Sequence, residues 1–104
     1  MGSVSDGGEP VETREPSGVV TVRYWAAARA AAGVATDDLT VAGPVTLAHL
    51  RERAVALHPE TGLEAVLGVC SALVGDRPVG SRDPASVEVR PGEVVEFLPP
   101  FAGG

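Results

Sequence analysis

The sequence predicts one small α+β domain, in which a main helix packs across a mixed sheet. Three observations support this fold class. The chain has 104 residues, which is enough for a single domain with one core. A β-branched and aromatic run at 19–25 predicts a strand, and an apolar stripe at 47–57 predicts an amphipathic helix. One helix that covers one sheet is the economical two-layer arrangement at this length.

The first two strands are predicted on either side of an alanine-rich segment. Residues 26–32, which end at Gly33, have helix-forming composition and are either a short helix stopped by glycine or a loop. The alternating residues 38–42 predict a second strand, antiparallel to the first. The residues of the first strand that share one face are Val20, Val22 and Tyr24.

The helix over 47–57 has the strongest pattern in the sequence. Thr46 stands at its N-cap, where the hydroxyl accepts a hydrogen bond from a free backbone amide. Pro59 ends the helix near His58, because proline cannot continue the helical hydrogen-bond pattern. The apolar stripe, at spacings of three and four residues, consists of Leu47, Leu50, Ala54 and Leu57.

The second half of the chain predicts several short elements. In chain order they are a helical turn at 63–67, a strand at 69–74, a turn at 75–76, an edge piece at 78–79, a short apolar stretch at 87–89, a type II turn at 91–92 and a last strand at 93–98. The edge piece is short because its proline lacks the amide hydrogen that a ladder needs. The predicted order is therefore β-β-α-β-β with one or two helical turns inserted.

Composition excludes several classes of function. The formal charge of −6, from 14 acidic and 8 basic residues, argues against a protein that binds nucleic acid through its phosphates. All the basic residues are arginines, which excludes chemistry that needs a lysine of this chain. No apolar run approaches the roughly 18 residues of a membrane helix, and no secretory signal is recognisable. With a single cysteine and no membrane segment, we expect a cytoplasmic protein.

The sequence indicates no self-contained active site. It has no dinucleotide or phosphate-loop fingerprint and no nucleophile elbow. His49 and His58 lie nine residues apart, which places them about 180° apart around a helix, so they cannot share a metal ion. Cys70 falls in a predicted buried strand and is expected to act as a small core side chain. We therefore expect no metal and no bound cofactor.

The two ends of the chain are predicted to lie outside the folded body of residues 19–98. Residues 1–18 are rich in glycine, proline and acidic residues, and they predict a flexible acidic tail. Residues 99–104 predict an extended tail, because the Pro99-Pro100 pair permits neither helix nor ladder. Fully extended, this C-terminal tail reaches roughly 20 Å.

The carboxylate of Gly104 is the one reactive group that this tail delivers. Gly103 and Gly104 lack a Cβ atom, so they can enter a channel that is too narrow for other residues. A carboxylate is ionised and a poor electrophile at neutral pH, so acyl chemistry requires its activation by a partner, for instance as a mixed anhydride with AMP. The other predicted partner-binding residues of the tail are Leu98, Pro99, Pro100, Phe101, Ala102 and Gly103.

These features resemble the MoaD/ThiS sulfur-carrier family, a ubiquitin-like β-grasp group. The resemblance covers about residues 19–104, and its diproline is closer to the small subunit of molybdopterin synthase (MoaD) than to the thiazole carriers. It implies a mixed sheet of four or five strands. Gly75 and Pro78 depart from the family pattern in the hairpin, and residues 1–18 lie outside it. The matching residues are Trp25-Ala26, Arg29, Gly33, Thr46, Leu50, Gly92-Glu93-Val94 and the Pro-Pro-x-x-Gly-Gly ending.

The resemblance implies a carrier that is not catalytic alone. A ubiquitin-activating-like (MoeB-like) enzyme would adenylate Gly104 with ATP and magnesium, and a sulfur donor enzyme would convert the adenylate to a thiocarboxylate. A molybdopterin synthase large subunit (MoaE-like) would then receive the sulfur. The alternatives are a carrier for the thiamin thiazole or cysteine pathways, and a ubiquitin-like protein modifier or binding module.

Docking of such a carrier requires contacts beyond its tail. Ordering six tail residues costs roughly 1–2 kcal/mol each, and Phe101 is the only sizeable apolar side chain among residues 99–104. We therefore expect an exposed apolar patch on the sheet near the last strand, with Leu98 and Phe101 at its edge. Leu73 and Val79 either contribute to this patch or, as the pattern favours, belong to the core.

Overall fold

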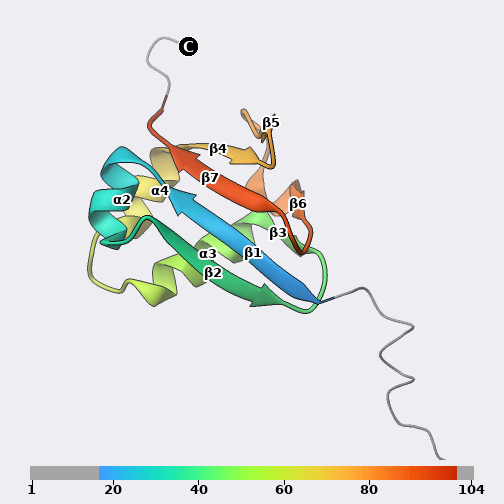
Figure 1. Ribbon diagram of the computed structural model, residues 1–104. Coiled ribbons are helices and arrows are strands. Elements are labelled where there is room, and N and C mark those ends of the chain that lie inside the picture. Colours follow the sequence, from blue (N-terminus) through green and yellow to red (C-terminus); the bar gives the residue numbers. More distant parts are fainter. Residues whose placement is uncertain (1–16, 101–104) are drawn as a thin grey trace, which may run out of the picture.

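The computed structural model describes residues 17–100 and consists of a five-stranded mixed sheet with helices on one of its faces (Figure 1). The strand order is β2-β1-β7-β4-β5. These strands are β1 (Gly18–Tyr24), β2 (Thr36–Val41), β4 (Ser71–Val74), β5 (Arg77–Pro78) and β7 (Val94–Leu98). The helices are α2 (Ala26–Ala32), α3 (Leu47–Leu57) and α4 (Leu63–Val69). Residues 1–16 and 101–104, which hold most of the two predicted tails, lie outside the described residues.

The sheet is mixed because its two central strands run parallel. Val22 of β1 stands opposite Val95 of β7 in this parallel pair. The neighbours on either side are antiparallel: β2 pairs with β1, and β4 pairs with both β7 and β5. The α+β class and the larger of the two predicted strand numbers are therefore confirmed.

A separate two-stranded ribbon was not predicted from the sequence. It pairs β3 (Val45–Thr46) with β6 (Glu88–Val89), and a 3-10 turn, η2 (Pro84–Ser86), precedes β6. Two residues per strand are too few to give a recognisable alternation. The ribbon leads directly into α3, since the Leu47 amide donates to the Val87 carbonyl over 2.9 Å.

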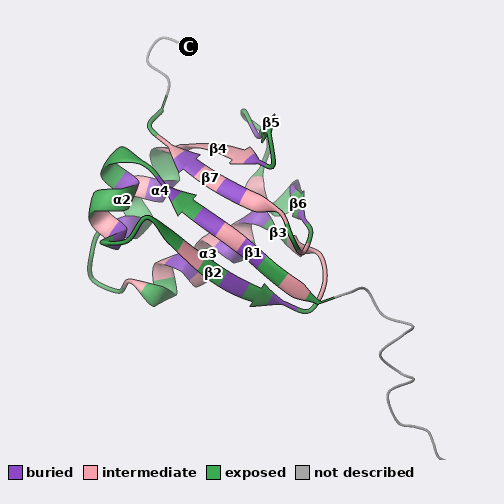
Figure 2. Cartoon of the chain, viewed as in Figure 1, coloured by how far each residue is buried: buried purple, intermediate pink, exposed green. Residues whose placement is uncertain are grey.

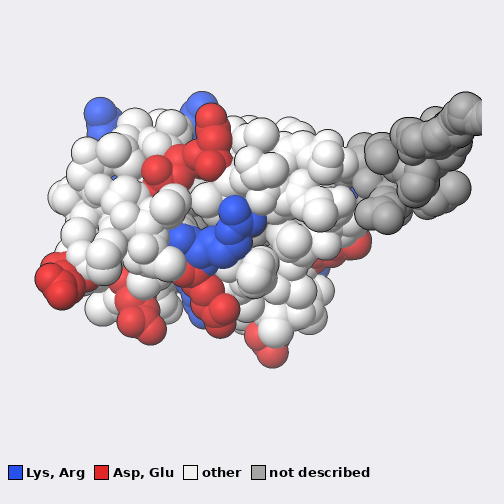
Figure 3. Space-filling model, turned by 90° about the horizontal axis from the view of Figure 1, so that it is seen from below, with Lys and Arg blue, Asp and Glu red and all other residues white. Residues whose placement is uncertain are grey.

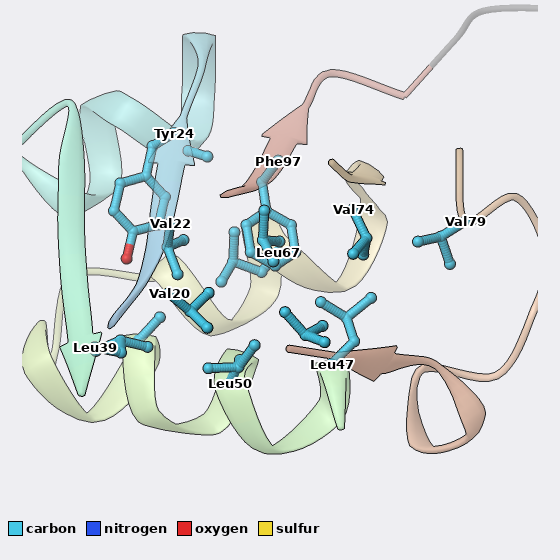
Figure 4. Packing of buried hydrophobic residues seen from close by; sticks show 14 of the residues in the cluster. Val20, Val22, Tyr24, Leu39, Leu47, Leu50, Leu67, Val74, Val79 and Phe97 are labelled. Atoms are coloured by element: carbon cyan, nitrogen blue, oxygen red, sulfur yellow. The ribbon is translucent and has the colours of Figure 1, made fainter. Parts of the chain in front are cut away.

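The core lies between the sheet and the helices. Burial alternates along β1 and β7, so that every second residue points toward the helix layer (Figure 2). The predicted face of β1 is confirmed, because Val20, Val22 and Tyr24 are all fully buried. These side chains and Phe97 meet Leu50 and Leu67 from the helices (Figure 4).

Helix α3 confirms the predicted N-cap and most of the predicted stripe. The Thr46 hydroxyl accepts a hydrogen bond from the His49 amide at 3.1 Å, and the helix ends at Leu57, before Pro59. Three stripe residues are buried, but Leu57 is 52% exposed, so the last residue of the predicted stripe is not part of the core. Leu57 is the last residue of the helix. The side chain that contacts the Tyr24 ring at this end of the helix belongs to the next residue, the half-buried His58.

The alanine-rich segment forms a short helix, α2, rather than a loop. Gly33 ends it with a φ of +78°, in the left-handed region that favours glycine. The second strand spans Thr36–Val41 instead of 38–42. It starts earlier because Thr36 and Asp37 also pair with β1, where Asp37 stands opposite Val22.

The third predicted strand begins later than expected. Val69 is the last residue of α4 and Cys70 is its C-cap, so the predicted turn at 63–67 is part of a seven-residue helix, whose Leu63 and Leu67 are buried at helical spacing. Cys70 is the C-cap of α4 rather than part of a buried strand, and it is partly buried against the core. The strand itself starts at Ser71.

The last strand is entered through the predicted glycine turn. Gly92 has a φ of +93°, and the Glu93 amide donates to the Arg90 carbonyl at 3.1 Å, as in a four-residue turn. The Glu93 carboxylate accepts from the Arg90 amide at 2.7 Å and from Arg77 Nη2 at 3.0 Å. Glu93 therefore fixes the turn and links it to β5, and β7 begins at Val94 instead of Glu93.

Candidate functional site: the end of β7 and the open sheet face

The end of β7 is the point at which the chain leaves the sheet. Leu98 is the last paired residue, opposite Ser71 of β4. Pro99 and Pro100 follow; both are exposed and without regular structure, as their lack of a ladder amide requires. The remaining site residues predicted from the sequence, Phe101, Ala102, Gly103 and Gly104, lie outside the described residues, and their roles stay predictions.

This end of β7 is held on both sides. Phe97 pairs with Tyr24 of β1 on one side and with Ala72 of β4 on the other. The Trp25 amide adds a hydrogen bond of 3.1 Å to the Phe97 carbonyl, just beyond the end of β1. A strand with a ladder on each side has little freedom, so the point from which the last residues depart is fixed relative to the body.

The face of the sheet that the helices leave uncovered carries half-buried apolar side chains. Residues directly opposite each other in a ladder share a face, so Leu73, which stands opposite Glu96 and Pro78, lies on this side. Val79, in contrast, is only 6% exposed and belongs to the core. We call this surface the docking face; it consists of Trp25, Leu73, Pro78, Val94, Glu96 and Leu98.

A polar cluster lies within the docking face. Trp25 Nε1 donates to Glu96 Oε2 at 3.1 Å, and Arg23 Nη1 lies 3.7 Å from the same oxygen. The indole is nevertheless 41% exposed, so it presents an apolar surface held in one orientation. This cluster was not predicted from the sequence, although the alternation of β1 places Arg23 on the face opposite to its core residues.

A second polar cluster lies on the helix side of the sheet and was also missed. The Tyr24 hydroxyl donates to Asp37 Oδ2 at 2.8 Å, and His58 Nε2 lies 2.5 Å from the same oxygen. Burial, and then the hydrogen bond to the Asp37 carboxylate, raise the pKa of the Tyr24 phenol. The cluster joins β1, β2 and the end of α3, and this position gives it a structural role.

Within the described residues, no group of three or more metal-ligating side chains comes together. Burial raises the pKa of the Cys70 thiol, which keeps this side chain protonated and weakly nucleophilic near neutral pH. No helix within residues 17–100 is both long and apolar enough to cross a membrane. Arginines and acids are interspersed on the surface seen from below (Figure 3), without a continuous basic stripe on this face.

The sequence of the chain decides its family. Residues 22–104 match the model of the ThiS family. The chain belongs to this family. ThiS-type proteins are small ubiquitin-like sulfur carriers that work with partner enzymes, and the match includes the whole of β7 and the residues that follow it.

Solved structures of similar fold support the β-grasp assignment of this ThiS-family chain. The HVO 2177 protein of Haloferax volcanii superimposes with a TM-score of 0.68 at 22% identity, over 99% of this chain and 94% of that one. A protein from Pyrococcus furiosus, provisionally named molybdopterin converting factor subunit 1, gives 0.64 at 24% identity, over 81% and 99%. Small archaeal modifier protein 1 of Haloferax volcanii gives 0.66 at 20% identity, over 84% and 100%. A search of curated protein sequences returns no match.

Proposed function

We propose that this ThiS-family chain is the small subunit of molybdopterin synthase and donates sulfur from a thiocarboxylate at Gly104. The observation that carries the proposal is the order of features at the end of β7. A strand fixed on both sides ends at Leu98, an exposed diproline follows, and the sequence closes on Gly103 and Gly104. A rigid body that ends in two residues without side chains suits delivery of a terminal carboxylate into a narrow channel.

The proposed cycle begins with two steps on a partner enzyme. A carboxylate oxygen of Gly104 attacks the α-phosphorus of ATP, with magnesium bound to the nucleotide, and pyrophosphate leaves. The terminal sulfur of a persulfide on a sulfur donor enzyme then attacks the acyl carbon, and AMP leaves. A thiol then attacks the donor enzyme's cysteine sulfur in the resulting acyl disulfide, forms a disulfide with that cysteine, and the thiocarboxylate on Gly104 departs as the leaving group.

The body of the carrier supplies the binding energy that the tail lacks. Glycine pays a large entropy cost on ordering, so the C-terminal residues alone bind weakly. The docking face offers Leu98 at the point of departure of the tail, Leu73 opposite Glu96, and Val94 at the start of the same strand. A partner that covers this face would hold the end of β7 at the entrance of its active site.

The proposed partners are a MoaE-like large subunit, a MoeB-like adenylating enzyme and a sulfur donor enzyme, all in the cytoplasm. Two observations support this pathway. The Leu98-Pro99-Pro100 step resembles the MoaD small subunits. The fold is also shared with the Pyrococcus furiosus protein that carries a molybdopterin converting factor name.

The second candidate function is a protein modifier joined through Gly104 to an amine of a target. The similarity of fold to small archaeal modifier protein 1 favours it. Both candidates use the same terminus and differ in the nucleophile that displaces AMP, which is a sulfur in one and an amine in the other. Only the modifier would produce adducts of higher mass with target proteins.

The test is intact-mass measurement of the chain recovered from its native host. We expect a fraction in which one oxygen is exchanged for sulfur at the C-terminus. A chain with one alanine added after Gly104 should fold normally and lack this fraction, since the reactive carboxylate is displaced. A chain with one alanine added before Met1 is the matched control and should keep it. Sulfur loading of the C-terminally extended chain would contradict the proposal.

Co-purification from the same host then separates the pathways. A stable complex with a molybdopterin synthase large subunit supports the first candidate. Amine-linked adducts through Gly104, without a sulfur-loaded fraction, would replace it with the modifier function.

A further inference from the structure

A pocket of about 270 Å³ lies on the helix side of the molecule, on the opposite side of the sheet from the docking face. It is bounded by α3, by the end of α4 and by the loop that follows β5. Its apolar lining includes Leu67 and Phe97. The residues of its lining that carry polar side chains are Arg51, Arg82, Ser81 and Cys70.

The arginines of this pocket differ from most others in the described part of the chain. Arg23, Arg77 and Arg90 form ion pairs with glutamates, and Arg53 Nη1 donates to the Thr40 carbonyl at 2.8 Å. Of the arginines within residues 17–100, only three have a side chain without a hydrogen bond or ion pair to another residue of that range. These are Arg29, Arg51 and Arg82, and two of the three line this one pocket.

No acidic side chain lines the pocket, so the positive charge of the two guanidiniums is not neutralised there. The thiol of Cys70 adds no negative charge, because burial raises its pKa and keeps it protonated. A neighbouring hollow of about 370 Å³ shares Arg51 but is also lined by Glu52 and Glu64. An anion is therefore favoured on the Arg82 side and disfavoured in the neighbouring hollow.

The size of the pocket limits what it can hold. Sites for drug-sized ligands and cofactors measure about 300–1,000 Å³, so this pocket lies just below that range. It suits one phosphate or carboxylate group that carries a small apolar part, and it is too small for a nucleotide. Guanidinium groups match such oxyanions well, because each presents a planar fork of N–H donors.

We propose that this pocket is an oxyanion-binding site, in which Arg51 and Arg82 hold a phosphate or carboxylate group beside the apolar lining. The pocket uses the core face of β7, since Phe97 is part of its lining, whereas partners of the carrier would use the opposite face. An anion and a partner could therefore bind at the same time. The proposal does not depend on the sulfur chemistry of Gly104.

Titration of the full-length protein with inorganic phosphate, at constant ionic strength, tests the site. The readout is the NMR signal of each arginine Nε–H group and of the backbone amides of residues 80–82. We expect saturable shifts at Arg51 and Arg82. Arg51→Gln and Arg82→Gln should each raise the dissociation constant about tenfold or more, as the loss of a charge-assisted hydrogen bond predicts.

Arg29→Gln is the matched control, because Arg29 has no partner among residues 17–100 and lies on α2, outside the pocket. This variant should bind phosphate like the parent. Equal, unsaturated shifts at all three arginines would show only general attraction of anions and would overturn the proposal. The proposal would also be overturned if Arg51 and Arg82 showed no shift with phosphate and no difference between the native chain and a chain with a carboxamide at Gly104.

The oxyanion has two possible sources, a free small molecule or the carboxyl end of a protein chain, including Gly104. A chain that carries a carboxamide at Gly104 distinguishes them. If the terminal carboxylate occupies the site, the Arg51 and Arg82 signals of the native chain should differ from those of the carboxamide chain. The signals of the two chains should converge when added phosphate displaces the terminal carboxylate. Identical signals, combined with saturable phosphate binding, assign the site to a free oxyanion.

Discussion

The two faces of the sheet are built from the same strands but follow different chemical rules. On the helix side, Val95 and Phe97 are buried together with the alternate residues of β1. On the docking face, their neighbours Val94, Glu96 and Leu98 remain partly exposed, and a carboxylate stands among them. A charge on the helix side would have to be buried, whereas on the docking face it stays in contact with water. The inner face therefore determines the fold, and the outer face is free to be shaped by partners.

The largest expected effect is on the free energy of unfolding, when a charged side chain is introduced on the inner face instead of the docking face. Val95→Asp buries an unpaired carboxylate in the core, which costs several kcal/mol and approaches the roughly 5–15 kcal/mol stability of a small domain. We expect this variant to be unfolded by circular dichroism. Val94→Asp, one residue away on the docking face, is the matched control and should change the free energy of unfolding by about 1 kcal/mol or less. Similar melting of the two variants would remove the distinction between the faces.

The next effect concerns binding and not stability. Leu73→Asp places a charge in the docking face beside Glu96, and we expect it to weaken binding of the proposed adenylating partner about tenfold to a hundredfold while the melting temperature changes little. Arg29→Asp is the control, because it introduces the same side chain away from the docking face. Calorimetric titration measures the affinity of both variants for the partner. Unchanged binding by Leu73→Asp would show that the partner binds another surface.

A smaller effect is expected from the Tyr24 cluster on the inner face. Tyr24→Phe removes the hydrogen bond to Asp37 and should cost about 0.5–1.5 kcal/mol at neutral pH. The pKa of Tyr24 is raised in the folded state, so the folded protein retains this proton when the unfolded chain loses it near pH 10. Stability from this group is therefore complete below pH 10 and declines as the pH rises above it.

Denaturant titrations between pH 8 and pH 12 check this dependence. The parent should lose stability above pH 10, and Tyr24→Phe should lose less over the same interval. Tyr24 is the only tyrosine, so the ultraviolet absorbance of tyrosinate reports its ionisation directly. Parallel pH profiles of parent and variant would contradict the raised pKa.

The smallest expected change in stability comes from the N-cap of α3, a local feature that belongs to neither face of the sheet. Thr46→Ala removes the acceptor for the His49 amide and should cost about 1 kcal/mol, the typical contribution of an N-cap. Thr46→Ser keeps the oxygen and should retain most of that stability. Chemical denaturation of the three proteins measures the difference, and equal losses in both variants would point to the methyl group instead of the cap.

The features predictable from the sequence are those that nearby residues determine. The strand at 19–25, the Thr46 cap and the glycine turn before β7 depend on alternation, helical spacing or backbone preference. Leu57 and the residues 69–70 were misassigned because the ends of α3 and α4 depend on packing against elements distant in sequence. Local spacing does not reveal that α3 ends over Tyr24, or that α4 continues past its buried Leu67 to the exposed Val69.

The candidate site was predictable only in part for the same reason. The composition of the last six residues identifies a candidate terminus without any knowledge of the fold. The Trp25–Glu96 contact joins residues 71 positions apart, and the Arg51–Arg82 pocket joins a helix to a loop beyond the next hairpin. Such pairings become visible only when the strand order is known.

The parallel pairing of β1 with β7 also bears on how the protein is synthesised. Its register joins Thr21 to Val94, so the middle of the sheet is incomplete until nearly all of the described chain has been made. Until then β1 has only β2 beside it, with one edge unpaired and open to association with other chains. Closure of the sheet and departure of the chain toward its proposed reactive terminus involve the same strand, so a nascent chain that lacks β7 has neither a complete fold nor the end that we propose it offers to a partner.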